Sequence, residues 1–192
     1  MTAVMEHPIG PYSVQDWLAL DPPVDGSRLE LILGHLHMTP APSGEHQRAA
    51  FRLARLVEDA VDAASRDDLH VVPAVNVRIS TPWRTALIPD VVVLNTPPRG
   101  TSFPAEALAL AVEIWSPGNP KAERETKQTA YAAAGVPFLW TIVQGRLRNP
   151  ILTALRLDGG RYIEECVVTA GMPATIDAGP VPVRIDPATL LR

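Results

Sequence analysis

The stretch LIPDVVVL at residues 87–94 decides the fold, together with LALAVEIW at residues 108–115. Each is a short apolar run, which is typical of a strand covered on both faces. A single carboxylate interrupts each run, Asp90 in the first and Glu113 in the second. An ionised carboxylate in such a place is costly unless a cation, a proton or a metal compensates its charge. Two of them, on strands that can be neighbours, therefore indicate a shared metal site.

Each acid also has a purely structural interpretation. Asp90 follows Pro89 and opens its valine run, so it can be a strand-opening residue that makes local turn hydrogen bonds. Glu113 lies well inside its run, and its structural alternative is a buried ion pair with an arginine. Taken together, the two acids favour a site.

Outward from these two strands, hydrophobic periodicity and turn residues predict further elements. The expected elements are a helix at residues 13–20, a hairpin at 29–38 that turns at Gly34, an amphipathic helix at 46–64, a strand at 71–79, a helix at 119–135, a strand at 137–143, a hairpin at 152–168 and an extended segment at 181–185. Asn119 is expected to cap its helix, and residues 95–106 are expected to form a loop. This order predicts an α/β domain with a mixed sheet and a helix on each side of its central strands.

Length and composition predict the compartment and exclude a membrane partner. A chain of 192 residues fits one domain with a substantial core. The single cysteine, Cys166, cannot form an internal disulfide, and it is expected to pack as a reduced thiol. Residues 1–8 lack the basic and apolar regions of a signal peptide, and no apolar run is long enough to span a membrane. We therefore expect a soluble cytoplasmic protein.

The net charge of -4 argues against bulk electrostatic adhesion to nucleic acid. It is compatible with a metal-dependent nuclease, because an acidic site lowers the sum while a local basic patch binds phosphate. Arg48, Arg52 and Arg55 on the polar face of the 46–64 helix either form a solvated face or follow a phosphate backbone. Charge alone does not decide the function.

A metal-assisted phosphodiesterase needs a small set of groups, and the sequence offers them. Mg²⁺ prefers oxygen ligands, commonly one or two carboxylates with waters and substrate phosphate. The metal activates a water and offsets developing negative charge, and a nearby lysine can add a positive charge or orient the water. Asp90 and Glu113 supply the carboxylates. Lys127 lies on the helix that follows the Glu113 strand, so it can fold back over the end of that strand.

Five motifs in order extend the pattern over most of the chain. They are LELILGHL at residues 29–36, PSGEHQ at 42–47, PDVVV at 89–93, EIWSP at 113–117 and the unit from Lys127 to YAAAGVP at 131–137. They resemble the PD-(D/E)XK nuclease superfamily and, more narrowly, the bacterial putative restriction endonucleases of the Uma-two type. Each motif is weakly specific by itself, but the ordered set is specific, and the resemblance covers roughly residues 12–190.

The resemblance implies a PD-(D/E)XK restriction-endonuclease-like α/β core, with a mixed central sheet flanked by helices and with additional β-hairpins. Residues 1–192 are expected to form a single domain, with the core at about 28–145 and a C-terminal β extension at 150–190. In this family pattern Asp90 and Glu113 bind the metal. Glu30 is implied as a further metal ligand, directly or through water.

Three more residues receive roles from the resemblance. The superfamily usually places a lysine two residues after the second acid, and here that position is Trp115, which cannot serve. Lys127 on the following helix matches the lysine that the family uses instead, and it would stabilise charge or orient water. His46 would contact substrate phosphate or position a carboxylate, and Ser116 would support the strand end.

The sequence departs from the family pattern and leaves simpler interpretations open. Glu123 stands where the family has aspartate, and Thr126 stands where it has glutamate. Glu30 can face solvent on its hairpin, and Lys127 can be a solvated helix lysine. His46 can be a residue of the helix-capping region. The metal acids and the lysine are all present, which favours an intact site.

The function implied by the resemblance is that of a Mg²⁺- or Mn²⁺-dependent DNA endonuclease, a hydrolase. Its metal-activated water would leave a 5′-phosphate and a 3′-hydroxyl, and a homodimer would cut two strands. One alternative is a nucleic-acid-binding or interaction module with the same fold and weak catalysis. A second is a structural protein whose acids form buried ion pairs.

Overall fold

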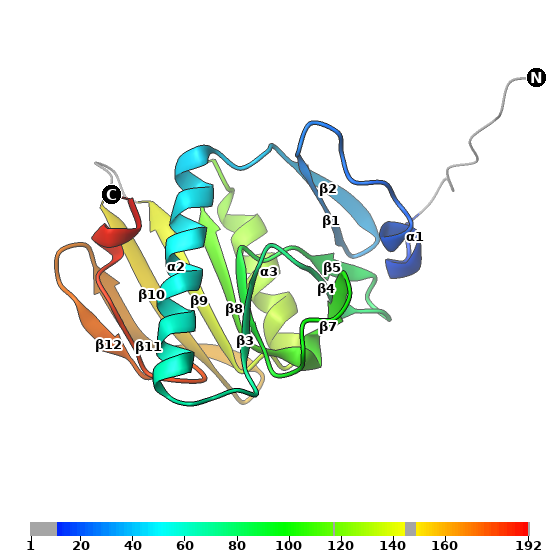
Figure 1. Ribbon diagram of the computed structural model, residues 1–192. Coiled ribbons are helices and arrows are strands. Elements are labelled where there is room, and N and C mark those ends of the chain that lie inside the picture. Colours follow the sequence, from blue (N-terminus) through cyan, green and yellow to red (C-terminus); the bar gives the residue numbers. More distant parts are fainter. Residues whose placement is uncertain (1–10, 117, 145–148, 192) are drawn as a thin grey trace, which may run out of the picture.

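A six-stranded mixed sheet lies at the centre of the fold (Figure 1). The structure, a computed structural model, describes residues 11–116, 118–144 and 149–191. The strands of this sheet are β3 (His70–Pro73), β6 (Val91–Leu94), β8 (Leu108–Trp115), β9 (Phe138–Gln144), β10 (Pro150–Asp158) and β11 (Arg161–Thr169), in the order β11-β10-β9-β8-β6-β3. β8 and β9 pair in parallel, whereas the other neighbours are antiparallel. The expected mixed sheet is confirmed.

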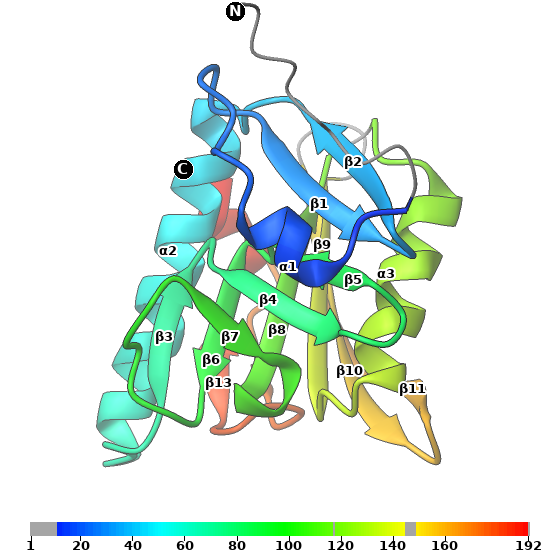
Figure 2. The same ribbon diagram turned by 90° about the vertical axis from the view of Figure 1, so that its right-hand side faces the viewer.

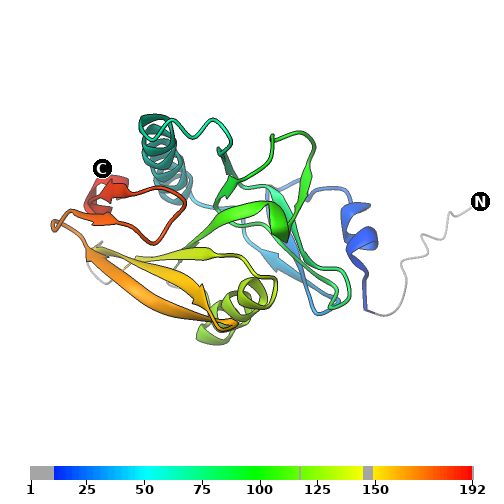
Figure 3. The same ribbon diagram turned by 90° about the horizontal axis from the view of Figure 1, so that it is seen from below.

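Helices cover opposite faces of this sheet (Figure 3). Alternate residues of β6 point to the two faces: Val91 and Val93 pack with the long helix α2 (Gly44–Ala63). Val92 and Leu94 lie in the second core cluster with Tyr131 of α3 (Lys121–Ala133). Because both faces are covered, the central strands β6 and β8 are apolar apart from Glu113, as the sequence indicated.

A second, five-stranded sheet packs on the face that carries α3 (Figure 2). Its strands are β1 (Arg28–Ile32), β2 (His35–Thr39), β4 (Asn76–Ser80), β5 (Thr85–Leu87) and β7 (Ser102–Pro104), in the order β2-β1-β5-β4-β7. The short helix α1 (Val14–Leu18) packs against it. The β1–β2 hairpin turns at Leu33 and Gly34, which both have positive φ, so the predicted glycine turn is confirmed.

Three local predictions were wrong. Residues 71–79 form two strands in different sheets, because the chain turns at Ala74, which has a φ of 49°. The expected loop at 95–106 contains the strand β7 and part of the short 3₁₀ helix η1 (Ala105–Ala107). The strand forms there because β7 pairs in parallel with β4. α3 has Pro120 at its N-cap, since the Asn119 side chain accepts a hydrogen bond from the Ser116 amide.

The C-terminal part extends both the sheet and the core. The hairpin predicted at 152–168 is confirmed as β10 and β11, and its turn lies at Gly159 and Gly160. Strands β12 (Ala174–Ile176) and β13 (Val183–Ile185) and the 3₁₀ helix η3 (Pro187–Leu191) add side chains to the core cluster under α2. Arg52 of α2 donates a hydrogen bond to the Thr189 carbonyl, so it holds this segment and does not form only a solvated face.

The structure tests the expectation about membrane spans but not the one about a signal peptide. Within the described residues, no helix is long and apolar enough to cross a membrane. The segment at residues 1–8, where no signal peptide was predicted, lies outside the described residues.

Candidate active site

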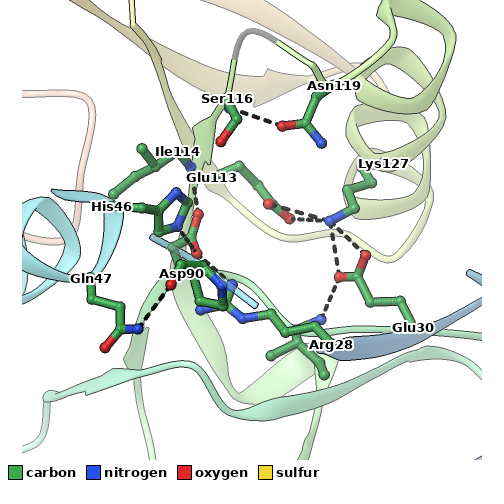
Figure 4. A network of polar contacts seen from close by, with 12 residues as sticks. Arg28, Glu30, His46, Gln47, Asp90, Glu113, Ile114, Ser116, Asn119 and Lys127 are labelled. Carbon is green, nitrogen blue, oxygen red and sulfur yellow. Dashed lines mark hydrogen bonds and ion pairs between the residues drawn. The ribbon is translucent and has the colours of Figure 1, made fainter. Parts of the chain in front are cut away.

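A cavity of about 520 Å³ opens between the first hairpin, the start of α2, the end of β8 and α3. All five side chains singled out as catalytic in the sequence line it: Glu30, His46, Asp90, Glu113 and Lys127. Figure 4 shows their network of polar contacts, in which Lys127 contacts Glu30 and Glu113, and Asp90 contacts His46. The elements that carry them are far apart in the chain, so the packing of the two sheets and α3 assembles the network.

Asp90 lies immediately before β6 and is 3% exposed. Its Oδ2 accepts a hydrogen bond from the Ile114 amide of β8 at 2.7 Å. Its Oδ1 lies 2.5 Å from Nη1 of Arg28 and 2.7 Å from Nε2 of His46. Its carboxylate partners therefore come from across the structure, so local turn hydrogen bonds do not explain this residue.

The charge on Asp90 is stabilised in spite of its burial. Burial favours the neutral carboxyl, but the hydrogen bond and charge of His46, the charge of Arg28 and the Ile114 amide together outweigh it. They hold the pKa of Asp90 below its usual range. Asp90 is therefore an anion near neutral pH.

Glu113 points from β8 toward α3, because its neighbours Val112 and Ile114 pack in the cluster under α2. Its Oε1 accepts a hydrogen bond from the Tyr131 hydroxyl at 2.8 Å, and its Oε2 lies 3.4 Å from Nζ of Lys127. Complete burial raises the pKa of Glu113 to about 8, although the charge of Lys127 opposes the rise. The structural alternative, a buried ion pair between Glu113 and an arginine, is wrong in its partner, since the cation beside Glu113 is Lys127.

Lys127 joins Glu30 to Glu113. Its Nζ lies 2.8 Å from Oε2 of Glu30 and 2.9 Å from Oε1. Burial favours the neutral amine, but the charges of Glu113 and Glu30 raise the pKa of Lys127 overall. Nζ also lies 5.6 Å from the centroid of the Trp115 ring, so the tryptophan stands beside the lysine. Lys127 is 5% exposed, which contradicts the interpretation as a solvated helix lysine.

Glu30 is also buried, at 2% exposure, and its Oε1 accepts a hydrogen bond from the Ile88 amide at 2.8 Å. A position facing solvent on the hairpin is therefore wrong for this residue. His46 lies in the first turn of α2, but the capping side chain is Ser43, whose Oγ accepts from the His46 amide. The imidazole itself contacts Asp90.

Two residues of the network were missed in the sequence, and each had a signal. Arg28 precedes Glu30 by two positions on β1, which places both side chains on one face of the strand. Tyr131 follows Lys127 by four positions on α3, which places both on one face of the helix. Ser116 lines the cavity, and its amide donates to Asn119.

The chemistry of the donor set decides whether these residues suit a divalent cation. Glu30, Asp90 and Glu113 present carboxylate oxygens to one cavity, and Mg²⁺ and Mn²⁺ prefer such donors. After burial and Lys127, the charges of Glu30 and Asp90 affect the pKa of Glu113 most, and both raise it. Among the described residues, no group of three or more His, Cys, Asp or Glu side chains is arranged as a ready metal site. The residues fit a divalent cation in donor type, because all three side chains can offer carboxylate oxygens.

A mixed sheet between helices, with buried acids and a lysine at one cavity, is the arrangement expected of the restriction-endonuclease-like fold. The Uma2 family model, described as "Putative restriction endonuclease", matches residues 14–180, and the chain belongs to this family. The resemblance to Uma-two-type proteins is therefore confirmed.

A solved structure shows the same fold. It is a crystal structure of a putative nuclease belonging to DUF820 from Anabaena variabilis, with 17% sequence identity and a TM-score of 0.70. The match covers 94% of this chain and 98% of that chain. None of the curated proteins matches the sequence. The predicted restriction-endonuclease-like fold is confirmed.

Proposed function

We propose that the protein is a metal-dependent DNA endonuclease that hydrolyses phosphodiester bonds with an activated water. One observation carries the proposal: three buried carboxylates and a lysine converge on an open cavity in a member of a nuclease family. Burying so many ionisable groups is costly, and such clusters concentrate at functional sites.

In this proposal Asp90, Glu113 and Glu30 hold Mg²⁺ or Mn²⁺. The bound cation would supply an activated water and offset negative charge on the phosphate. Lys127 has its ammonium group held by Glu30, and from there it stabilises negative charge on the phosphate or orients the water. His46 positions the Asp90 carboxylate through their 2.7 Å contact. The products would be a 5′-phosphate and a 3′-hydroxyl.

Cleavage assays test the proposal directly. Supercoiled plasmid, single-stranded DNA and RNA are incubated with Mg²⁺, Mn²⁺ or EDTA, with wild type and with Glu113→Gln. Glu165→Gln is the matched control, because Glu165 forms an exposed ion pair with Arg156 on the far hairpin. We expect metal-dependent nicking of DNA that Glu113→Gln loses and Glu165→Gln keeps. If folded wild type cleaves no substrate with either metal, the proposal is wrong.

A second candidate is a nucleic-acid-binding module with the same fold. The observation that favours it is that cations of the protein itself lie against the carboxylates, with Arg28 on Asp90 and Lys127 on Glu30. This module would bind labelled DNA equally in Mg²⁺ and EDTA, and Asp90→Ala would leave the binding unchanged. An endonuclease would bind more tightly in the presence of metal.

The proposal also includes a cytoplasmic homodimer, since two copies would bring one site to each strand of a duplex. Strand β11 is an edge of the six-stranded sheet and exposes Ile163 and Val167, which supports pairing of two copies there. The free Cys166 fits a reducing compartment. Light scattering should report twice the chain mass of 20.7 kDa, and a mass of one chain at cleaving concentrations would remove the dimer from the proposal.

A further inference from the structure

Arg28 lies between the buried Asp90 and the open cavity. Its Nη1 is 2.5 Å from Oδ1 of Asp90, and the two side chains differ in exposure, at 20% for Arg28 and 3% for Asp90. Figure 4 shows Arg28 beside Asp90, and Arg28 is also one of the residues that line the cavity. The guanidinium is thus both the counter-ion of a proposed metal ligand and a part of the wall that substrate would meet.

A divalent cation on Asp90 conflicts with this ion pair. Oδ1 already has two partners, Arg28 and His46, and Oδ2 has the Ile114 amide. A carboxylate oxygen accepts about two strong hydrogen bonds, so Oδ1 is saturated. A metal ion and a guanidinium on one carboxylate would also repel each other, which disfavours both.

Of the three donors to Asp90 among the described residues, Arg28 is the one that can leave. The Ile114 amide is fixed in the backbone of β8, between two paired strands. The His46 imidazole is 11% exposed and is attached to the first turn of α2. Arg28 has the longer, more exposed side chain and open space beside it in the cavity.

We propose that Arg28 is an exchangeable counter-ion that becomes a phosphate ligand. In the metal-free protein it neutralises Asp90, and when a divalent cation binds Asp90 it turns into the cavity and binds a phosphate of the nucleic acid. This inference rests on the proposed function. A guanidinium suits the second role because it donates two parallel hydrogen bonds to phosphate oxygens.

Lys127 does not share this role, because its surroundings differ from those of Arg28. Its ammonium group lies between Glu30 and Glu113, beside the Trp115 ring, and it is 5% exposed. Within the part of the chain that the structure describes, Arg28 has one carboxylate partner, Asp90. The exchange also couples the two ligands: metal frees Arg28 for phosphate, so phosphate must in turn tighten metal binding by the same factor.

The test uses Arg28→Met, Arg28→Lys and the matched control Arg78→Met. Arg78 is a part-buried arginine of β4 that donates to Ser102, away from the candidate active site. Mn²⁺ binding is measured by calorimetry without nucleic acid. Binding of a fluorescein-labelled DNA duplex is measured by anisotropy in Ca²⁺. Neither readout requires cleavage.

We expect Arg28→Met to bind Mn²⁺ about tenfold more tightly than wild type, because a competing cation is gone. The same variant should bind the duplex about tenfold more weakly, because a charged hydrogen-bonding group is lost. Arg28→Lys keeps the charge but not the paired donors, so its Mn²⁺ affinity should stay near wild type while its duplex affinity falls. Arg78→Met should match wild type in both assays.

Tighter Mn²⁺ binding together with weaker duplex binding distinguishes the exchange from a structural role of Arg28, since damage to the site would weaken the binding of both ligands. The exchange is overturned if Arg28→Met melts cooperatively but binds Mn²⁺ no more tightly than wild type. It is also overturned if neither wild type nor the variant binds Mn²⁺. Unchanged duplex binding overturns the phosphate role. If Arg28→Met does not fold, unchanged duplex binding by Arg28→Lys has the same meaning. If wild type binds Mn²⁺ but cleaves nothing, the endonuclease proposal fails while the Mn²⁺ comparison still decides the exchange.

Discussion

Replacing Lys127 with methionine should strongly destabilise the metal-free protein. The ammonium group lies 2.8 Å from Glu30 and 3.4 Å from Glu113. Without it, Glu30 keeps the hydrogen bond from the Ile88 amide, and Glu113 keeps the hydrogen bond from the Tyr131 hydroxyl. Removing one member of a buried ionic group costs about 3–5 kcal/mol, because the opposite charge stays buried without compensation.

This loss should be measured by urea and thermal unfolding in EDTA at neutral pH. For a chain of this size a loss of that magnitude lowers Tm by about 10 °C. Lys121→Met is the matched control, since Lys121 lies on the same helix with its side chain 88% exposed. Its effect should stay below about 0.5 kcal/mol.

A second variant shows whether charge is the cause. Adding Glu30→Gln to Lys127→Met removes a buried anion, so the double variant should regain part of the lost stability. A loss of less than about 1 kcal/mol in the free energy of unfolding of Lys127→Met would refute the assigned role of charge. A double variant that is less stable than Lys127→Met alone would refute it as well.

Three further outcomes are expected. The free energy of unfolding of Glu113→Gln minus that of wild type should increase by more than about 1 kcal/mol from pH 5 to pH 9 in EDTA. The folded wild type holds the Glu113 proton up to about pH 8, whereas the unfolded chain releases it near pH 4.5, so the wild type loses stability as pH rises through that window. If the free energies of unfolding of the two proteins change in parallel with pH, this explanation is contradicted. Tyr131→Phe removes the 2.8 Å hydrogen bond to Glu113 and should lower the free energy of unfolding by about 1 kcal/mol, whereas an unchanged urea midpoint would argue that the bond contributes nothing. Gly34→Ala should cost more than about 1 kcal/mol, because a Cβ there would lie 2.7 Å from the Cβ of Pro11 at a φ of 84°, while Gly44→Ala, with open space around it, should melt like wild type.

The sequence predicted the central strands and the main acids for the same physical reason. A strand covered on both faces has no polar side, so Asp90 and Glu113 stood out as charges inside apolar runs. Lys127 was found by its position on the following helix and by family resemblance. The pairing of these groups was not predictable, because it depends on how the second sheet packs against α3.

The missed features lacked a local signal of comparable strength. An arginine in a hairpin is usually exposed, so Arg28 did not stand out although it lies two residues from Glu30 on β1. Ala74 carries no sequence mark of its positive φ, and residues 71–79 therefore read as one strand. Asn119 is a good capping residue, but its side chain is engaged by the Ser116 amide.

The attachment of the β1–β2 hairpin has a consequence for the order in which the chain folds. β1 pairs with β5 at one register position, Leu31 with Ala86, while its charged contacts reach Asp90 and Lys127 across long separations in sequence. Contacts of such separation form late, because the chain between them must first be ordered. The hairpin should therefore be a separate cooperative unit that opens before the six-stranded sheet, with β2 amides exchanging with solvent faster than those of β8. The last part of the molecule to fold would then be the part that closes the site.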